Sequence, residues 1–400
     1  MAVDAIKLQQ AQALIEPQIQ KAILQDVPKS SIFMQLAKKL PNMTSRQTKM
    51  RVLDLLPMSY WVDGDTGYKQ TSRQAWDNVF MYAEELAVIV PIPEAILADS
   101  DIDILGEVTP RVLESIGIRV DSAAIFGNNM PKSWGMSIID RARIAGNNVK
   151  VESGQDYYDV ILGEDGVFAK IEEMGYGVNG TVADLSMKAK LRGLRDSNKQ
   201  PIFKNDMQGA TNYALDGTPM YFPENGAFDK SQAQMLAGDW SKAVYSIRQD
   251  IQTKILTESV IQDPVSKEIV YNLAQQDMIA LRVTFRLGWA LPNPATRLDE
   301  NRESCPFAYL EPVTPAITQK VTLTVKNGTG EEAKAVEKAT VIINGESRKR
   351  TNSSGIVEFY VRKGSYTITV KKDGYSTVNE TVTVVDAEVT KTIAIPAVAK

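Results

Sequence analysis

Apolar residues recur at helical spacing over a stretch in the first third of the chain. A short apolar run at residues 86–90 predicts a strand, which Pro91 and Pro93 would end. Beyond it, apolar positions follow one another as on one face of an α-helix. The stripe consists of Ile104, Leu105, Val108, Val112, Leu113, Ile116, Val120 and Ala124. We therefore predict a strand followed by a long amphipathic helix.

The ends of this helix are marked by suitable residues. Ser100 or Asp101 can act as the N-cap, and Gly127 can adopt the left-handed conformation that stops a helix. A helix over residues 101–127 would be about 35–40 Å long. Pro110 would have to be tolerated inside it as a bend, or would mark a second start. Such a helix is a structural scaffold element and not an active site.

Residues 48–83 alternate between apolar and polar positions on both sides of a turn at residues 63–67. This pattern predicts an extended hairpin with a tip rich in Asp and Gly. Its aromatic side chains are more numerous than one small local core needs, so we expect them to be buried against a neighbouring subunit. The candidate contact residues are Tyr60, Trp61, Asp63, Asp65, Tyr68, Lys69 and Trp76.

The middle of the chain contains a G-x-G-x-x-G pattern at Gly175, Gly177 and Gly180. A dinucleotide-binding loop requires a strand before this pattern and a helix after it. Here residues 164–174 are helix-like and residues 181–186 resemble a short strand, so the order is reversed. We interpret the glycines as a connection and expect no cofactor.

A strand is predicted within residues 275–294, because apolar residues alternate there. The apolar face consists of Leu281, Val283, Phe285, Leu287 and Trp289. Arg282 and Arg286 have the opposite parity and therefore face away from it. They could lie on a solvated face or form ion pairs with a neighbouring subunit, and the sequence leaves both interpretations open.

The chain changes character near residue 311. A Pro- and Thr-rich linker at residues 313–318 leads into residues 316–400, which contain no Trp, Met or Cys. Short alternating runs separated by turns predict an antiparallel sandwich of about seven strands. The runs are residues 320–326, 339–344, 356–362, 365–371, 377–385 and 389–396. The segment resembles the carboxypeptidase-regulatory-like, immunoglobulin-like modules, a family without catalytic residues of its own.

Composition narrows the functions that the chain can have. It has 400 residues, a hydrophobic content of 44% and a formal net charge of −4, which are ordinary for a globular protein. It contains no histidine and one cysteine, Cys305, which excludes His-based catalysis, His-ligated metal sites and an intrachain disulfide. No apolar run has transmembrane length, and the N-terminus is unlike a signal peptide. We expect a protein that is not an enzyme, with no catalytic, metal-binding or cofactor-binding residues and no membrane partner.

Residues 316–400 carry more Lys and Arg than Asp and Glu, so the acidic balance of the chain comes from the part before them. Arg348, Lys349 and Arg350 could form a cationic patch that contacts glycans or a host surface, or could be a solvated turn. The acidic remainder argues against tight or sequence-specific DNA binding.

The order of several weak motifs resembles that of the tailed-phage major capsid proteins. The predicted strand, the segment PIPEAILADS and the long helix ending in DSAAIFGN look like the spine region of that family. Further landmarks follow in the family's order. They are a helix within residues 187–204, the LDGTP strand within 215–228, Gly238-Asp-Trp240, and the ALRVTFRLG strand within 275–294.

This resemblance implies an α+β chain with the Johnson, or Hong Kong 97-type, capsid fold at residues 1–312 and an all-β immunoglobulin-like sandwich at residues 316–400. The implied parts of the shell domain are an N-terminal arm at 1–47 with an amphipathic helix, an extended loop at about 48–83, the spine helix at about 101–127, and axial and peripheral regions at 130–312. Many copies would assemble in the host cytoplasm into the icosahedral shell of a virion. The shell would enclose double-stranded DNA and display the sandwich outside, and a separate scaffolding protein and a portal would be partners.

Two other functions stay open on the sequence alone. An encapsulin-type compartment shares the capsid fold but packages enzymes. A cell-surface adhesin could carry a β-sandwich at its tip, although the absence of a secretion signal counts against it.

Overall fold

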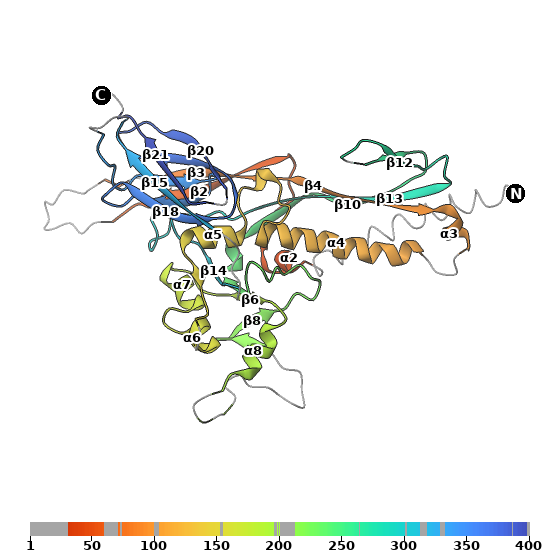
Figure 1. Cartoon of the computed structure of the whole chain (residues 1–400), viewed down its shortest axis with the longest axis horizontal. Coiled ribbons are helices and arrows are strands. Elements are labelled where there is room, and N and C mark those ends of the chain that lie inside the picture. Colours follow the sequence, from red (N-terminus) through yellow and green to blue (C-terminus); the bar gives the residue numbers. More distant parts are fainter. Residues whose placement is uncertain are drawn as a thin grey trace. The chain divides into compact units, whose positions relative to one another are not determined.

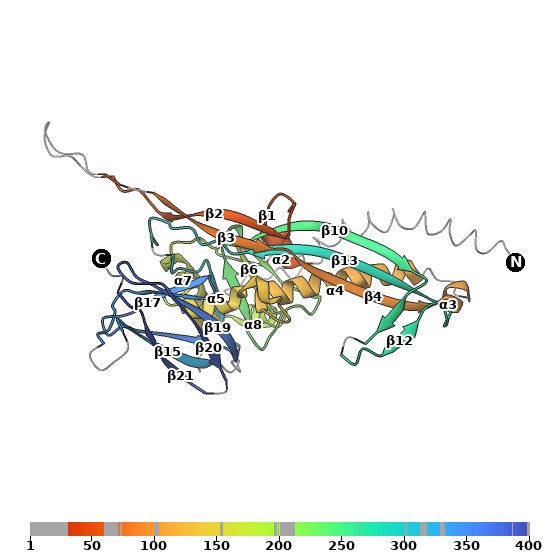
Figure 2. The ribbon, with the colours of Figure 1, turned by 90° about the horizontal axis from the view of Figure 1, so that it is seen from above.

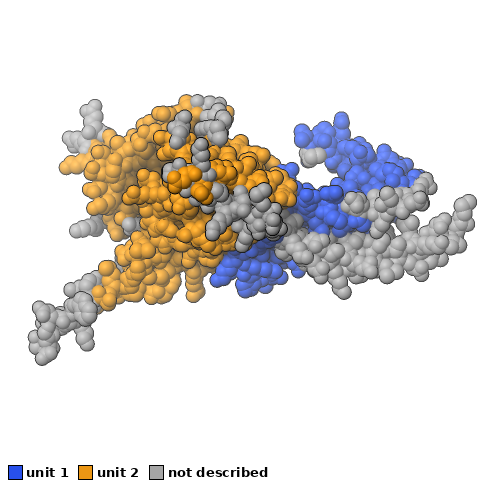
Figure 3. Space-filling view, turned by 90° about the horizontal axis from the view of Figure 1, so that it is seen from below, with its two compact units in different colours: residues 1–48, 80–121, 244–290 blue, residues 49–79, 122–243, 291–400 orange. Residues whose placement is uncertain are grey.

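The computed structural model consists of two compact units (Figure 3). It describes residues 31–59, 71–72, 74–99, 104–152, 155–195, 198, 200, 213–263, 265–300, 302–312, 318–328, 333–385 and 387–397. Unit 1 comprises residues 1–48, 80–121 and 244–290, and unit 2 comprises residues 49–79, 122–243 and 291–400. The predicted arm helix, the hairpin tip and most of the linker lie outside the described residues.

A four-stranded sheet with the order β1-β10-β13-β4 is the framework of unit 1 (Figure 1). Its strands are β1 (Lys38–Lys39), β10 (Val244–Leu256), β13 (Met278–Ala290) and β4 (Glu84–Pro93). The alternation predicted for β13 is confirmed, because every second residue from Leu281 to Trp289 is buried. The ring of Phe33 packs edge-on against that of Trp289, with centroids 5.6 Å apart.

Strand β4 continues further than predicted. Pro91 and Pro93 do not end it but lie inside it, opposite Ala280 and Met278 of β13. Because β4 is an edge strand, it needs only alternate N–H groups to pair with β13. The two prolines share one parity, so both can occupy positions whose N–H would point away from the sheet.

The long helix is confirmed as α4 (Ile104–Phe126), which follows the short helix α3 (Glu94–Asp99). Ile116 and Val120 of its apolar stripe are 1% and 2% exposed. Pro110 lies inside the helix and does not mark a second helix start. Gly127, with φ +73°, ends the helix, and its N–H donates to the carbonyl of Ala123 at 3.0 Å. The predicted N-cap residues lie outside the described ranges.

A buried carboxylate on α4 holds the short helix α2 (Ile32–Leu36). Asp121 is 2% exposed and accepts hydrogen bonds from the hydroxyl of Ser31 at 2.7 Å and from the N–H of Phe33 at 3.0 Å. Negative charge is favourable at a helix N-terminus, where backbone N–H groups lack partners. Asp121 therefore fixes the start of the described chain to the spine helix within unit 1.

Unit 2 contains a six-stranded mixed sheet with the order β5-β14-β9-β6-β8-β7. Its strands are β5 (Asn148–Val149), β14 (Phe307–Leu310), β9 (Met235–Gly238), β6 (Gly180–Ala183), β8 (Thr218–Tyr221) and β7 (Ala214–Leu215). The accompanying helices are η1 (Lys132–Trp134), α5 (Ile138–Ala145), α6 (Tyr157–Leu162), α7 (Val167–Glu173), α8 (Met187–Gly193) and η2 (Trp240–Lys242). Apolar side chains of α6, α7 and α8 share one core with this sheet.

The G-x-G-x-x-G pattern begins after α7 and ends at Gly180, the first residue of β6, so a helix precedes it and a strand follows. This is the reverse of the order in a dinucleotide-binding loop. The interpretation of these glycines as a connection is confirmed.

The C-terminal segment of unit 2 folds as a seven-stranded sandwich, visible in Figure 2. A three-stranded sheet, β18-β15-β21, packs on a four-stranded sheet, β17-β16-β19-β20, through a shared apolar core. The strands are β15 (Gln319–Lys326), β16 (Thr340–Ile343), β17 (Ser347–Arg350), β18 (Ile356–Val361), β19 (Gly364–Lys371), β20 (Val378–Val384) and β21 (Val389–Ala394).

Two details of the sandwich differ from the sequence prediction. Strands β15 and β21 pair in parallel, so the sandwich is not antiparallel throughout. Arg348, Lys349 and Arg350 form strand β17 instead of a turn. The compact units also do not separate at the predicted linker, because the sandwich belongs to the same unit as residues 122–243.

The base of the predicted hairpin consists of β2 (Gln47–Leu55) and β3 (Ala75–Tyr82), which form a two-stranded sheet. Both strands alternate between exposed and half-buried residues over most of their length. The division between the two units passes through both strands. No helix in the described part of the chain is long and apolar enough to cross a membrane.

We expect Ile116→Ala to lower the unfolding free energy of the subunit by about 2–4 kcal/mol, because it leaves a cavity under the buried stripe of α4. Arg119→Ala, at an exposed position of the same helix, is the matched control and should have little effect. Urea unfolding followed by circular dichroism measures both variants. Equal losses in the two variants would show that the stripe is not a packed core.

Candidate subunit-contact surfaces and the sandwich junction

The hairpin presents large apolar side chains to solvent. On β3, Trp76 is 63% exposed and Phe80 is 44% exposed, and Met58, beyond the end of β2, is 51% exposed. Side chains of this size are mostly buried in a folded chain. Trp76 is the one predicted contact residue of the hairpin that the structure describes. The others, Tyr60, Trp61, Asp63, Asp65, Tyr68 and Lys69, lie outside the described residues.

A second exposed apolar group lies in unit 1, on the small sheet of β11 (Val260–Gln262) and β12 (Ile269–Asn272). Val265 is 90% exposed, Ile269 is 61% exposed and Val270 is 48% exposed. Sequence reasoning missed this hairpin, because its strands are short and have no apolar face that a local core would require.

The two arginines predicted on the polar side of β13 have different surroundings. The Nε of Arg286 donates to Glu85 of the neighbouring strand β4 at 2.8 Å, so Arg286 forms its ion pair within unit 1. The side chain of Arg282 is exposed. On the polar side of β13, Arg282 is therefore exposed, whereas Arg286 is paired within unit 1.

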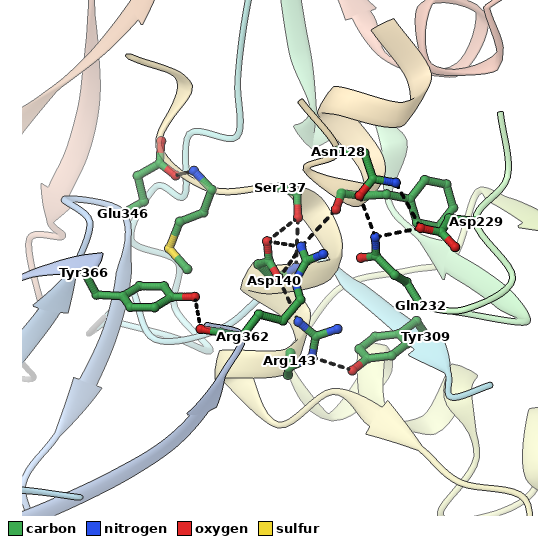
Figure 4. Close-up of polar contacts among 12 residues, drawn as sticks. Asn128, Ser137, Asp140, Arg143, Asp229, Gln232, Tyr309, Glu346, Arg362 and Tyr366 are labelled. Atoms are coloured by element: carbon green, nitrogen blue, oxygen red, sulfur yellow. Dashed lines mark hydrogen bonds and ion pairs between the residues drawn. The ribbon is translucent and has the colours of Figure 1, made fainter. Parts of the chain in front are cut away.

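The sandwich is joined to the rest of unit 2 at helix α5, as Figure 4 shows. Ser137 caps this helix and donates its hydroxyl to Asp140 at 2.8 Å. Arg362, at the end of β18, donates to both carboxylate oxygens of Asp140, at 2.9 and 2.7 Å, and to the carbonyl of Phe126 at 2.9 Å. Arg143 approaches the same carboxylate at 2.7 Å. One carboxylate thus binds two guanidinium groups, one from each side of the junction.

Two phenol groups complete this cluster. Tyr309 lies 3.2 Å from the Nε of Arg143, and the hydroxyl of Tyr366 donates to the carbonyl of Arg362 at 2.8 Å. Burial acts to lower the pKa of Arg143, but Tyr309 and Asp140 outweigh it and raise this pKa. Burial, and then the charge of Asp140, raise the pKa of Tyr366 to about 12. Arg143 and Tyr366 are therefore both protonated at neutral pH.

A second charge pair crosses the junction nearby. Glu346, in the β16–β17 turn, pairs with Arg141 of α5 and accepts the N–H of Met136 at 3.1 Å. Burial raises the pKa of Glu346, and Arg141 opposes that shift. Gly135, with φ +72°, passes so close that an added Cβ would lie 2.7 Å from the Glu346 carboxyl carbon.

Apolar packing accompanies these charges. Met136 and Ile144 are 2% and 1% exposed and belong to the same core cluster as the interior of the sandwich. The core of the sandwich therefore continues onto α5, and the sandwich is not an appendage held by the linker alone.

Comparison with known proteins identifies the family. The model of the phage capsid family matches residues 11–296. The chain belongs to the phage capsid family. A solved structure from Microbacterium phage Oxtober96 is 33% identical, with a TM-score of 0.62 over 70% of this chain and 91% of that chain. One from Mycobacterium phage Cain is 28% identical, with a TM-score of 0.62 over 72% of this chain and 91% of that one. No curated protein matches the chain.

The comparisons confirm the predicted fold class and the predicted role as a major capsid protein. The protein is a major capsid protein with the Hong Kong 97-type fold, a structural component of the virion that assembles from many copies. A second model, the PEGA domain, matches residues 335–396 of the capsid protein, within the sandwich. The phage capsid match ends before the sandwich begins.

The cations predicted as a ligand patch of the capsid protein are engaged within the chain. Arg348 donates to Asp77 of β3 at 2.9 Å, and Lys349 donates to the carbonyl of Glu358 at 3.1 Å. Arg350 lies 3.3 Å from Glu303. The side chain of Arg348 is 16% exposed. Each of the three side chains therefore has an acceptor in unit 2, and their role as a ligand patch stays a prediction.

Arg362→Gln should loosen the sandwich of the capsid protein. Removing one partner of a largely buried ion pair leaves Asp140 with a single guanidinium, and we expect a loss of about 2–4 kcal/mol in unfolding free energy. Lys371→Gln removes the same charge from an exposed position of β19 and is the control. Urea unfolding of the unassembled subunit compares them, and an equal effect of both variants would contradict the role of the pair.

Tyr366→Phe tests the phenol through its pH dependence. The pKa of Tyr366 rises from its ordinary 10.0 to about 12 in the folded chain, so its contribution to stability is complete below pH 10 and falls as the pH rises to 12. We expect wild type to lose its advantage over Tyr366→Phe by about 1.4 kcal/mol per pH unit in that window. The unfolding free energies of wild type and Tyr366→Phe, measured between pH 9 and 11.5, test this expectation. A constant difference between them would mean that the phenol titrates with its ordinary pKa.

Proposed function

We propose that this major capsid protein builds an icosahedral phage head around double-stranded DNA, and that the hairpin of each subunit binds the surface of its neighbour. The observation that carries the proposal is the exposure of Trp76 and Phe80 on a hairpin that the described part of the chain does not cover. A capsid subunit must keep such side chains available, because shell contacts form only when the next copy arrives.

The strand pattern of β3 supports the same role. Trp76, Asn78 and Phe80 are exposed and alternate with half-buried residues, so one side of the strand presents two aromatic rings around an amide. Aromatic anchors of this kind dominate the energy of protein interfaces, and truncating one typically costs about 2 kcal/mol or more. We expect the undescribed aromatics Tyr60, Trp61 and Tyr68 to extend this contact toward the tip.

The hairpin of β11 and β12 is a second contact surface in this proposal. Its exposed Val265, Ile269 and Val270 have no cover in the described part of the chain. Two contact surfaces on one subunit allow each copy to bind more than one neighbour, which a closed shell requires. Arg282 is a candidate for an ion pair in the same kind of contact.

We place the sandwich on the outer side of the shell. An extra module of this size inside the shell would take up volume that the packaged DNA needs. The polar outer positions of β19 and β20 suit a solvated surface, since Thr367, Thr381 and Thr383 are all exposed. A separate scaffolding protein and a portal are further expected partners, and DNA would be enclosed without sequence-specific contacts.

The alternative with the same fold is an encapsulin-type compartment. The family match and the phage origin of the similar structures favour the phage head. Contents separate the two proposals, because a compartment purified from its native source would hold enzyme and a phage head would hold DNA.

The double variant Trp76→Ala/Phe80→Ala tests the hairpin. We expect it to fold normally. Because it lacks the aromatic anchors, it should form no shells even at concentrations about tenfold above those at which wild type assembles. Light scattering and electron microscopy, with a scaffolding protein co-expressed where needed, measure shell formation. Tyr360→Ala, which removes an aromatic ring that is 51% exposed on the sandwich, is the matched control and should assemble.

Closed shells formed by the double variant at wild-type concentrations would contradict the role of the hairpin. Failure of wild type to form shells even with the scaffolding protein would contradict the whole proposal.

A further inference from the structure

Four charged side chains join the sandwich to the base of the hairpin within unit 2. Arg302, from the loop before β14, donates to Asp54 of β2 at 2.9 Å and to Asp77 of β3 at 3.0 Å. Arg348 of the sandwich donates to Asp77 at 2.9 Å and lies 3.5 Å from Asp54. Each carboxylate is therefore shared by two guanidinium groups, and both strands of the hairpin are held.

The burial of the two arginines makes this cluster sensitive to the loss of any member. Their side chains are 5% and 16% exposed. Burial and the charge of Arg302 lower the pKa of Arg348, while Asp54 and Asp77 act in the opposite direction. Burial acts to raise the pKa of Asp77, but the N–H of Asn78 and both arginines outweigh it, so this pKa is lowered. Because the buried guanidinium groups of Arg302 and Arg348 lie next to each other, both carboxylates are needed to balance their charge.

We propose that the sandwich is a clamp for the hairpin, in which Arg348 holds β2 at Asp54 and β3 at Asp77 against the rest of unit 2. This inference rests on the proposed function, because it concerns the hairpin as the element that meets the neighbouring subunit. The sandwich then acts inside its own subunit, and its strand β17 carries Arg348 for that purpose. A hairpin whose base is held before assembly loses less conformational freedom when it binds.

The competing explanation is that the loop before β14 holds the hairpin without the sandwich. That loop also contacts β2 through its backbone, since the N–H of Ala295 donates to the carbonyl of Leu53 at 2.8 Å. If those contacts were sufficient, removal of Arg348 would leave the hairpin base unchanged. A variant of Arg348 therefore separates the two explanations.

Hydrogen–deuterium exchange of the unassembled, full-length subunit is the test. We expect Arg348→Gln to speed amide exchange about tenfold in β2 and β3 around Asp54 and Asp77. Arg350→Gln is the matched control, because it removes the same charge from the same strand, at a position that pairs with Glu303 of the loop before β14. It should leave exchange in β2 and β3 unchanged.

A second variant approaches the clamp from the hairpin side and covers the case in which Arg348→Gln disturbs the sandwich itself. Asp77→Asn should speed exchange in β2 and β3 while β15 and β21 keep their protection. The proposal is overturned if Arg348→Gln leaves the hairpin base unchanged, if Arg350→Gln loosens it equally, or if Asp77→Asn has no effect there. Because exchange is measured before assembly, its outcome is independent of whether Trp76 and Phe80 contact a neighbour.

Discussion

The organisation of unit 2 depends on the hydrogen bonds and ion pairs of the Asp140 carboxylate. It lies in the first turn of α5, is fixed by the capping hydroxyl of Ser137, and binds Arg143 of its own helix and Arg362 of the sandwich. Arg362 also reaches the carbonyl of Phe126, the last residue of the spine helix. Helix end, axial region and sandwich therefore share one charge cluster, and the core of the sandwich continues beside it onto Met136 and Ile144. A capsid protein with this arrangement carries its C-terminal module as a built-in part.

The distribution of charged and apolar side chains follows from what a shell subunit must do. Charged groups near the junction are paired inside the chain: Asp140 with two arginines, Glu346 with Arg141, and Arg302 and Arg348 with two aspartates. Within the described residues, apolar groups on the hairpin and on β12 are exposed. In the proposed assembly, paired charges inside unit 2 reduce the entropy cost of ordering on binding, and the contacts between subunits bury apolar surface.

Elements with regular periodicity could be predicted from the sequence, and contacts between distant residues could not. The stripe of α4, the alternation of β13 and six of the strands in the sandwich follow from local spacing, because each has one face that must be buried. Strand β17 was missed because three of its four side chains are charged. Its backbone pairs with β16, and Arg348 and Arg350 meet acids on the hairpin and on the loop before β14. Arg348 and Asp77 are 271 positions apart, and Arg362 and Asp140 are 222 apart. No local pattern relates such residues, whereas the exposed aromatics of the hairpin could be anticipated because their number exceeded any local need.

Cryo-electron microscopy of particles assembled from the full chain tests the central claim most directly. The account predicts a closed icosahedral shell in which the hairpin of each subunit lies on its neighbour. It also predicts sandwich density on the outer surface that is continuous with α5 and as well resolved as the shell beneath it. Sandwich density on the inner surface, or density that is blurred while the shell is sharp, would contradict it.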